Sequence, residues 1–69
     1  MTEVHYGVIQ QGGRWRIFGP NLRFGSYARR SSAVRAARRL AARSLPVGIL
    51  HVQDETGELL PPERIPHDE

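Results

Sequence analysis

The glycine pair Gly12-Gly13 separates two runs that are rich in β-branched and aromatic residues, VHYGVIQQ at 4–11 and RWRIF at 14–18. Both glycines can take the positive φ angles that a two-residue hairpin turn requires. Strands joined by so short a turn must pair antiparallel with each other. The sequence therefore predicts a hairpin at the start of the chain, and the rest of the fold has to be built onto it.

Two more strands are predicted beyond this hairpin. The turn residues Gly19-Pro20-Asn21 precede LRFGSY at 22–27, which predicts a third strand that continues the meander. VGILHVQ at 47–53 predicts a fourth strand. The turn DETGE follows it, and the residues at 58–60 are a candidate short partner strand.

A helix is predicted between the third and fourth strands, with Ser31 or Ser32 as its N-cap and Ser44 near its end, before Pro46 and Gly48. Small apolar residues recur there at helical spacing and define the face that packs on the sheet. That face consists of Ala33, Val34, Ala37, Leu40, Ala41, Ser44 and Leu45. Because it is mostly alanine, it allows a close approach to the sheet but buries little area.

These elements predict one small α+β domain over residues 1–60, a three- to four-stranded antiparallel sheet with one helix on one face, in β-β-β-α-β order. The chain has 69 residues and no cysteine, so tight packing or self-association must replace disulfides.

The Pro-rich acidic tail at 61–69 is expected to be extended or disordered, or else to fold back over the basic residues. The expected core is Val8, Trp15, Ile17, Leu22, Phe24, Val34, Ala37, Leu40, Ala41, Leu50 and Val52.

Charge is distributed unevenly along the chain. No Asp or Glu lies between Val4 and Gln53, whereas nine of the ten basic residues, all of them arginines, lie between Arg14 and Arg43. Six of the seven acids follow Gln53. Arginine binds phosphate through a planar fork of donors, so this basic body fits a nucleic-acid partner. The absence of lysine equally fits the codon usage of a GC-rich genome, and both explanations stay open.

Strand alternation divides the arginines into two groups on opposite sides of the molecule. The residues expected to face the helix are Trp15, Ile17, Leu22 and Phe24. The residues expected to lie opposite, our candidates for phosphate and base-edge contacts, are Arg14, Arg16, Asn21 and Arg23. The second basic face, on the helix, consists of Arg35, Arg38, Arg39 and Arg43. For either group the alternative is an ordinary solvated surface.

The sequence Gly12-Gly13-Arg14-Trp15, the Ala-rich helix led by Ser31 and the closing ILHVQDETGEL together resemble a bacterial family of short proteins, the domain of unknown function 2188. The resemblance covers nearly the whole chain. It implies a β-β-β-α-β arrangement and no known activity.

A second resemblance covers residues 6–41, where YGV, GRW, RFGSY and AVRAARRLA are similar to the AP2-type DNA-binding domain. This resemblance implies a three-stranded sheet packed on one helix, with Trp15 in the core and DNA contacts from Arg16 and Arg23 on the outer side of the sheet. The sequence departs from that family at residues 9–11, where Ile, Gln and Gln replace its first-strand arginines. The fourth strand is also foreign to it.

The function expected is non-enzymatic, the binding of DNA or RNA through the sheet face away from the helix. The alternative is a protein-interaction or assembly domain, a homodimer whose arginines are only a solvated surface. No catalytic residue, cofactor, metal site or small-molecule substrate is expected, because the acids lie in a turn and a tail and the histidines at 5, 51 and 67 lack metal-ligand spacing. No signal or membrane-spanning run is visible, so a bacterial, cytoplasmic protein with no membrane partner is expected.

Overall fold

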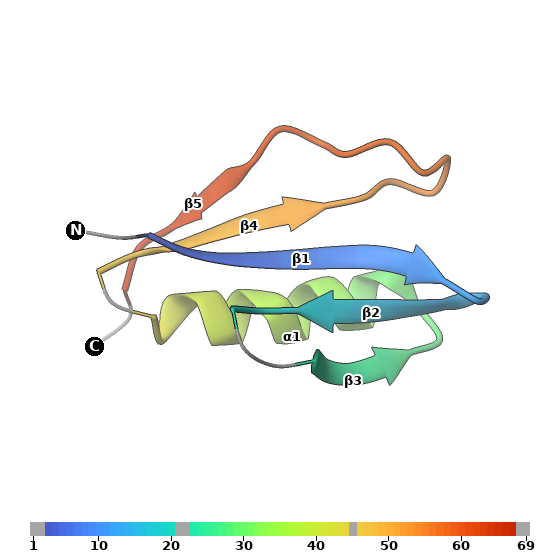
Figure 1. Ribbon diagram of the computed structural model, residues 1–69, viewed down its shortest axis with the longest axis horizontal. Coiled ribbons are helices and arrows are strands. Elements are labelled where there is room, and N and C mark those ends of the chain that lie inside the picture. The colour runs from blue at the N-terminus through green and yellow to red at the C-terminus, as the bar shows by residue number, and fades with distance from the viewer. Residues whose placement is uncertain (1–2, 21–22, 45, 68–69) are drawn as a thin grey trace.

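The computed structural model of the chain describes residues 3–20, 23–44 and 46–67, and for Arg23 and Phe24 it describes the backbone alone. In these ranges one helix covers one face of a five-stranded sheet (Figure 1). The elements are β1 (Val4–Gln11), β2 (Arg14–Phe18), β3 (Arg23–Tyr27), α1 (Arg30–Ala42), β4 (Gly48–Val52) and β5 (Glu63–Ile65). The strands lie side by side in the order β3-β2-β1-β4-β5. The predicted class, α+β with one helix packed on one face, is confirmed.

The hairpin predicted at Gly12-Gly13 joins β1 to β2. Gln11 pairs with Arg14 across the turn, and the two glycines adopt φ angles of 61° and 78°. These angles lie in the left-handed region that side chains with a Cβ rarely adopt. The local turn chemistry therefore fixes the register of β1 with β2.

A β-bulge at Gly25 decides which side chains of β3 face which side of the sheet. The pairing of β3 with β2 shifts between Arg16 and Ile17, and Gly25 takes a φ angle of 51°. After the shift, Ser26 lies opposite Arg16 and Tyr27 lies opposite the buried Trp15. The extra residue thus keeps Tyr27 on the core side, where it packs, and turns Ser26 to the other side.

The helix begins earlier than predicted. Arg29 is the N-cap, and it makes no capping hydrogen bond through its side chain, so the prediction of Ser31 or Ser32 at this position is wrong. The first turn is held differently, because Arg30 Nε donates a hydrogen bond to the carbonyl oxygen of Gln53 at 3.0 Å, just after β4. With this tertiary contact the helix begins at Arg30, on the N-terminal side of the two serines. No helix of the described residues is long and apolar enough to cross a membrane.

The alanine face of α1 lies directly on the sheet. Ala33, Ala37 and Ala41 have no exposed surface, and Val34 and Leu40 flank them half-buried. At the end of the helix Ala41 comes so close to Gly48 of β4 that a Cβ on Gly48 would lie 2.5 Å from the Ala41 carbonyl oxygen. Alanine on one side and glycine on the other therefore set the helix–sheet distance.

The fourth strand is present, but its pairing differs from the expectation. β4 pairs parallel with β1, from Val4 opposite Gly48 to Val8 opposite Val52, so the sheet is mixed. β3, α1 and β4 form a crossover connection, which places β4 parallel to β3 and hence parallel to β1. The meander itself is antiparallel, as expected.

The chain returns along β4 after a tight turn. Asp54 Oδ1 accepts hydrogen bonds from the Thr56 backbone, the Thr56 hydroxyl and the Glu58 backbone at 2.7–3.0 Å. The hydroxyl of Thr56 is the main reason that the pKa of Asp54 lies below its ordinary value. In place of the short strand considered at 58–60, Leu59 makes one bridge to Gln53.

The fifth strand was not predicted. Residues 63–65, within the Pro-rich tail, form β5 and pair antiparallel with β4, with Arg64 opposite Ile49. The edge of β4 away from β1 is thereby covered (Figure 1).

The core lies between α1 and the sheet. Seven of the eleven predicted core residues are buried there, namely Val8, Trp15, Ile17, Ala37, Ala41, Leu50 and Val52. Val34 and Leu40 are only half-buried at its margin. Leu22 and the side chain of Phe24 lie outside the described residues. Tyr6 was missed, and its hydroxyl lies 2.7 Å from Ser44 Oγ beneath the end of the helix.

Candidate nucleic-acid interface

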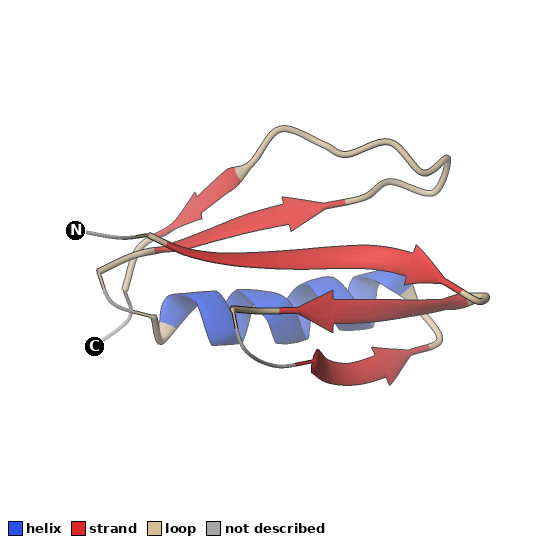
Figure 2. Cartoon of the chain, viewed as in Figure 1, coloured by secondary structure: helices blue, strands red, loops and turns tan. Residues whose placement is uncertain are grey.

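The face of the sheet turned away from α1, which we call the outer face, is not covered by any second layer of described residues (Figure 2). Alternation and strand register place every other residue of each strand on it. These residues are His5, Gly7, Ile9 and Gln11 of β1, Arg14, Arg16 and Phe18 of β2, Ser26 of β3, Ile49 and His51 of β4, and Arg64 of β5.

Arg14 lies along the outer face toward the edge strand β3. Its Nε donates to the Ser26 hydroxyl at 2.5 Å, and its Nη2 donates to the Ser26 carbonyl oxygen at 3.2 Å. The bulge at Gly25 makes this contact possible, because it turns Ser26 to the outer side. Arg14 is therefore held in place by neutral acceptors, and no acid in the described part of the chain neutralises its positive charge.

Arg16 is the more unusual of the two cations. It is half-buried between its strand neighbours Ile9 and Ser26, and its Nε is buried without a hydrogen-bond partner among the described residues. Leaving such a donor unsatisfied costs about 1–3 kcal/mol. None of the ion pairs between described residues involves Arg16 or Arg14. The outer side of β2 thus carries two cations that no carboxylate of the described residues compensates.

The other two candidate residues of this group lie at the β3 edge. The backbone register places Arg23 opposite Phe18, the pairing expected for the outer side, although the Arg23 side chain is not described. Asn21 lies outside the described residues. Two of the four candidates, Arg14 and Arg16, are therefore brought together on the uncovered face.

The second basic group lies on the exposed side of α1. Arg35, Arg39 and Arg43 are exposed there, across the helix from the buried alanines. Arg38 differs, because its Nη2 lies 2.9 Å from a carboxylate oxygen of Glu63 on β5. The acidic tail thus reaches the helix arginines, whereas its described acids make no contact with Arg14 or Arg16.

Sequence reasoning missed a histidine pair on the outer face. His5 Nδ1 and His51 Nε2 lie 2.9 Å apart, and the two rings stack with centroids 5.2 Å apart and planes 21° apart. Glu3 lies 3.8 Å from the other nitrogen of His5 and forms an ion pair with Arg64 at 3.0 Å. The signal that could have found the pair is the crossover through the helix, which makes β4 a parallel neighbour of β1.

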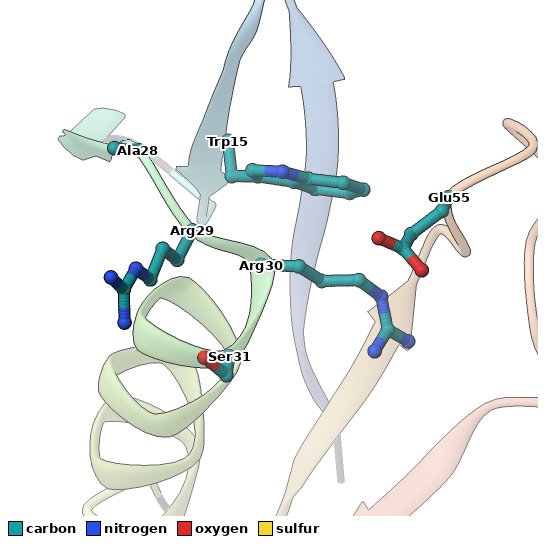
Figure 3. A pocket seen from close by; sticks show the side chains of 6 residues that line it. All are labelled: Trp15, Ala28, Arg29, Arg30, Ser31 and Glu55. Carbon is teal, nitrogen blue, oxygen red and sulfur yellow. The ribbon is translucent and has the colours of Figure 1, made fainter.

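A hollow of about 420 Å³ opens at the start of α1. Figure 3 shows the indole of Trp15 on one side of it, and Arg30 extending toward the loop that carries Glu55. Ala28, Arg29 and Ser31 complete its lining. The hollow lies on the core side of Trp15 and is separate from the outer face, and its Arg30 is already bound to Gln53. Among the described residues no group of three or more His, Asp or Glu side chains is arranged to hold a metal ion.

Comparison of the chain with protein-family models, with curated proteins and with solved structures gave no match. The two resemblances noted in the sequence therefore stay expectations.

Proposed function

We propose that this protein binds nucleic acid through the outer face and has no catalytic role. The observation that carries the proposal is the position of Arg14 and Arg16, two cations that form no ion pair with a described residue. They lie beside the half-exposed Phe18 on a sheet face that no second layer of described residues covers. Cations that bind phosphate, together with an aromatic ring that can stack on a base, are the two kinds of contact that such proteins combine.

The unsatisfied Nε of Arg16 supports this assignment. A buried donor without an acceptor destabilises the free protein, and a phosphate or base oxygen would supply that acceptor once the half-buried Arg16 side chain turns outward. Arg14 adds a second positive charge two residues away on the same strand. The helix arginines are a weaker candidate, because Glu63 already neutralises Arg38.

The proposal includes a cytoplasmic location, since a chain without cysteine suits a reducing compartment that contains nucleic acid. The resemblance to the AP2-type domain agrees with binding from this side of the sheet, at Arg16 and Arg23.

The test is equilibrium binding measured by fluorescence anisotropy. Labelled duplex and single-stranded DNA and RNA are titrated with the protein at about 50 mM salt, where electrostatic binding is strong, and again at about 200 mM. We expect binding at the lower salt concentration that weakens at the higher one. No binding to any of the four probes at the lower concentration would overturn the proposal.

A second candidate function, assembly into a homodimer, is favoured by the apolar atoms on the same face. Ile9 and Phe18 are half-exposed there and lie outside the core cluster. Two outer faces in contact would bury both residues, but would also bring the uncompensated arginines of the two copies together, which disfavours this arrangement. Sedimentation equilibrium distinguishes the two, because assembly requires a stable dimer and nucleic-acid binding does not.

A further inference from the structure

Gly7 leaves a gap on the outer face. Its cross-strand partners are Phe18 on β2 and His51 on β4, so a ring stands on each side of a position that has no side chain. A Cβ built on Gly7 would find one described atom within 4 Å, the backbone oxygen of His51 at 4.0 Å. No described side chain therefore occupies the position of a Cβ on Gly7, although the residue itself is half-buried.

The width of this gap suits one planar ring. Two strand spacings of about 4.8 Å separate the Phe18 and His51 backbones, roughly 10 Å in all. A nucleic-acid base occupies about 3.4 Å along a stack. A base inserted edge-on over Gly7 therefore has room between these two positions, with Phe18 on one side and His51 on the other.

The His51 ring is positioned before any ligand arrives. His51 is stacked on His5 and hydrogen-bonded to it. Phe18 is half-buried and is not part of the core cluster, so part of its side chain is exposed on the outer face. Because His51 is already held by His5, little conformational entropy is lost at this side chain when a base stacks beside it.

The two arginines lie flat on the sheet instead of projecting from it. Arg14 is bound through Nε and Nη2 to Ser26, and Arg16 has its Nε buried at the surface of the sheet. Arginines that read a duplex must extend to the base edges inside a groove. Arginines that lie flat beside the gap fit instead a nucleic-acid backbone that runs across the sheet, with its bases turned toward the Phe18 and His51 rings.

From these observations we infer that the outer face takes single-stranded nucleic acid, with one unpaired base seated over Gly7 between Phe18 and His51 and neighbouring phosphates on Arg14 and Arg16. This inference rests on the proposed function and specifies the kind of nucleic acid. Bases in a duplex are stacked on one another and cannot enter the gap, so the site selects unpaired bases.

The test compares a labelled oligothymidine with a duplex of the same length at about 50 mM salt. We expect the single strand to bind about tenfold more tightly, which lies within the range that stacking one base contributes. Gly7→Val fills the gap and should remove most of this preference. Gln11→Val, four residues further along β1 on the same face, is the matched control and should bind as the natural protein does.

A second pair of variants tests the ring itself, whatever Gly7→Val does to folding. Phe18→Leu keeps an apolar side chain but removes the stacking surface, and we expect single-strand affinity to fall about tenfold. Phe18→Tyr keeps the ring and should retain the affinity.

Equal or tighter binding of the duplex, or unchanged single-strand affinity in both Gly7→Val and Phe18→Leu, would overturn the inference and leave the proposed function standing. Failure of every probe to bind would overturn both. A stable dimer that binds neither probe would assign the outer face to self-association.

Discussion

Gly48 of β4 touches the backbone of Ala41 in α1 so closely that no side chain fits between them. A Cβ on Gly48 would lie 2.5 Å from the Ala41 carbonyl oxygen, 2.6 Å from its Cβ and 2.7 Å from its Cα. Two of these three atoms belong to the backbone and cannot move without shifting the helix. The spacing of the two layers, and so the stability of a small core built largely on alanine, depends on this contact.

The Gly48→Ala substitution should therefore strongly destabilise the protein. We expect the free energy of unfolding to fall by about 3 kcal/mol, which is the upper end of the range for substitutions that add atoms to a packed core. For a chain of this size that is a large part of the total, which lies in the range of roughly 4–10 kcal/mol. Chemical denaturation followed by circular dichroism measures the change.

Gly7→Ala is the matched control, because the added methyl group on the outer face meets nothing closer than 4.0 Å. It should change the free energy of unfolding by about 0.5 kcal/mol or less, as surface substitutions do. Equal effects of the two substitutions would show that the helix does not approach β4 as described.

The buried Tyr6 hydroxyl should contribute about 1 kcal/mol to stability. It lies 2.7 Å from Ser44 Oγ, and the Ser44 hydroxyl donates to the Leu40 carbonyl oxygen, so Tyr6 is the donor in their contact. We expect Tyr6→Phe to lower the free energy of unfolding by that amount. Tyr27→Phe, which removes a hydroxyl with no hydrogen-bond partner among the described residues, should have little effect. A neutral Tyr6→Phe would contradict the buried hydrogen bond.

Asp54 should make the protein more sensitive to acid. The Thr56 hydroxyl and the Glu58 and Thr56 backbone hydrogen bonds hold its folded pKa below the ordinary value. The carboxylate therefore stabilises the fold fully above its unfolded pKa of about 3.9, and this contribution is lost as the pH falls through the lower, folded pKa. In Asp54→Asn, stability should fall less steeply below about pH 4.

The direct measurement is an NMR titration of the Asp54 side-chain carboxyl group. Thr56→Val removes the largest cause of the shift and should move the pKa of Asp54 back toward its ordinary value. Titration of Asp54 at its ordinary value in the natural protein would contradict the hydrogen-bonded turn.

Features set by neighbouring residues could be predicted from the sequence. Gly12-Gly13 specified the hairpin because the turn geometry depends on those two residues, and alternation then placed Trp15 and Ile17 in the core. The same alternation predicted the side of the sheet on which Arg14 and Arg16 lie. These features depend on backbone preferences that act within a few residues.

Features that depend on distant partners could not be predicted in the same way. β5 is a three-residue strand among prolines, and it exists because β4 offers a free edge to residues 63–65. The stacking of His5 on His51 depends on the parallel pairing of β1 with β4. The start of α1 at Arg30, before the serines, depends on a contact with Gln53. In each case the tertiary arrangement prevailed over the local sequence signal.

The salt dependence of nucleic-acid binding, compared between two matched double variants, tests the central claim most directly. Each phosphate contact contributes about 0.7–0.9 to the slope of log K against log salt concentration. Arg14→Gln combined with Arg16→Gln should therefore make the slope shallower by about 1.5 and weaken binding. Arg35→Gln combined with Arg39→Gln, on the exposed side of α1, should leave the slope unchanged. A change confined to the helix pair, or an unchanged slope in the outer-face pair, would contradict binding by the outer face.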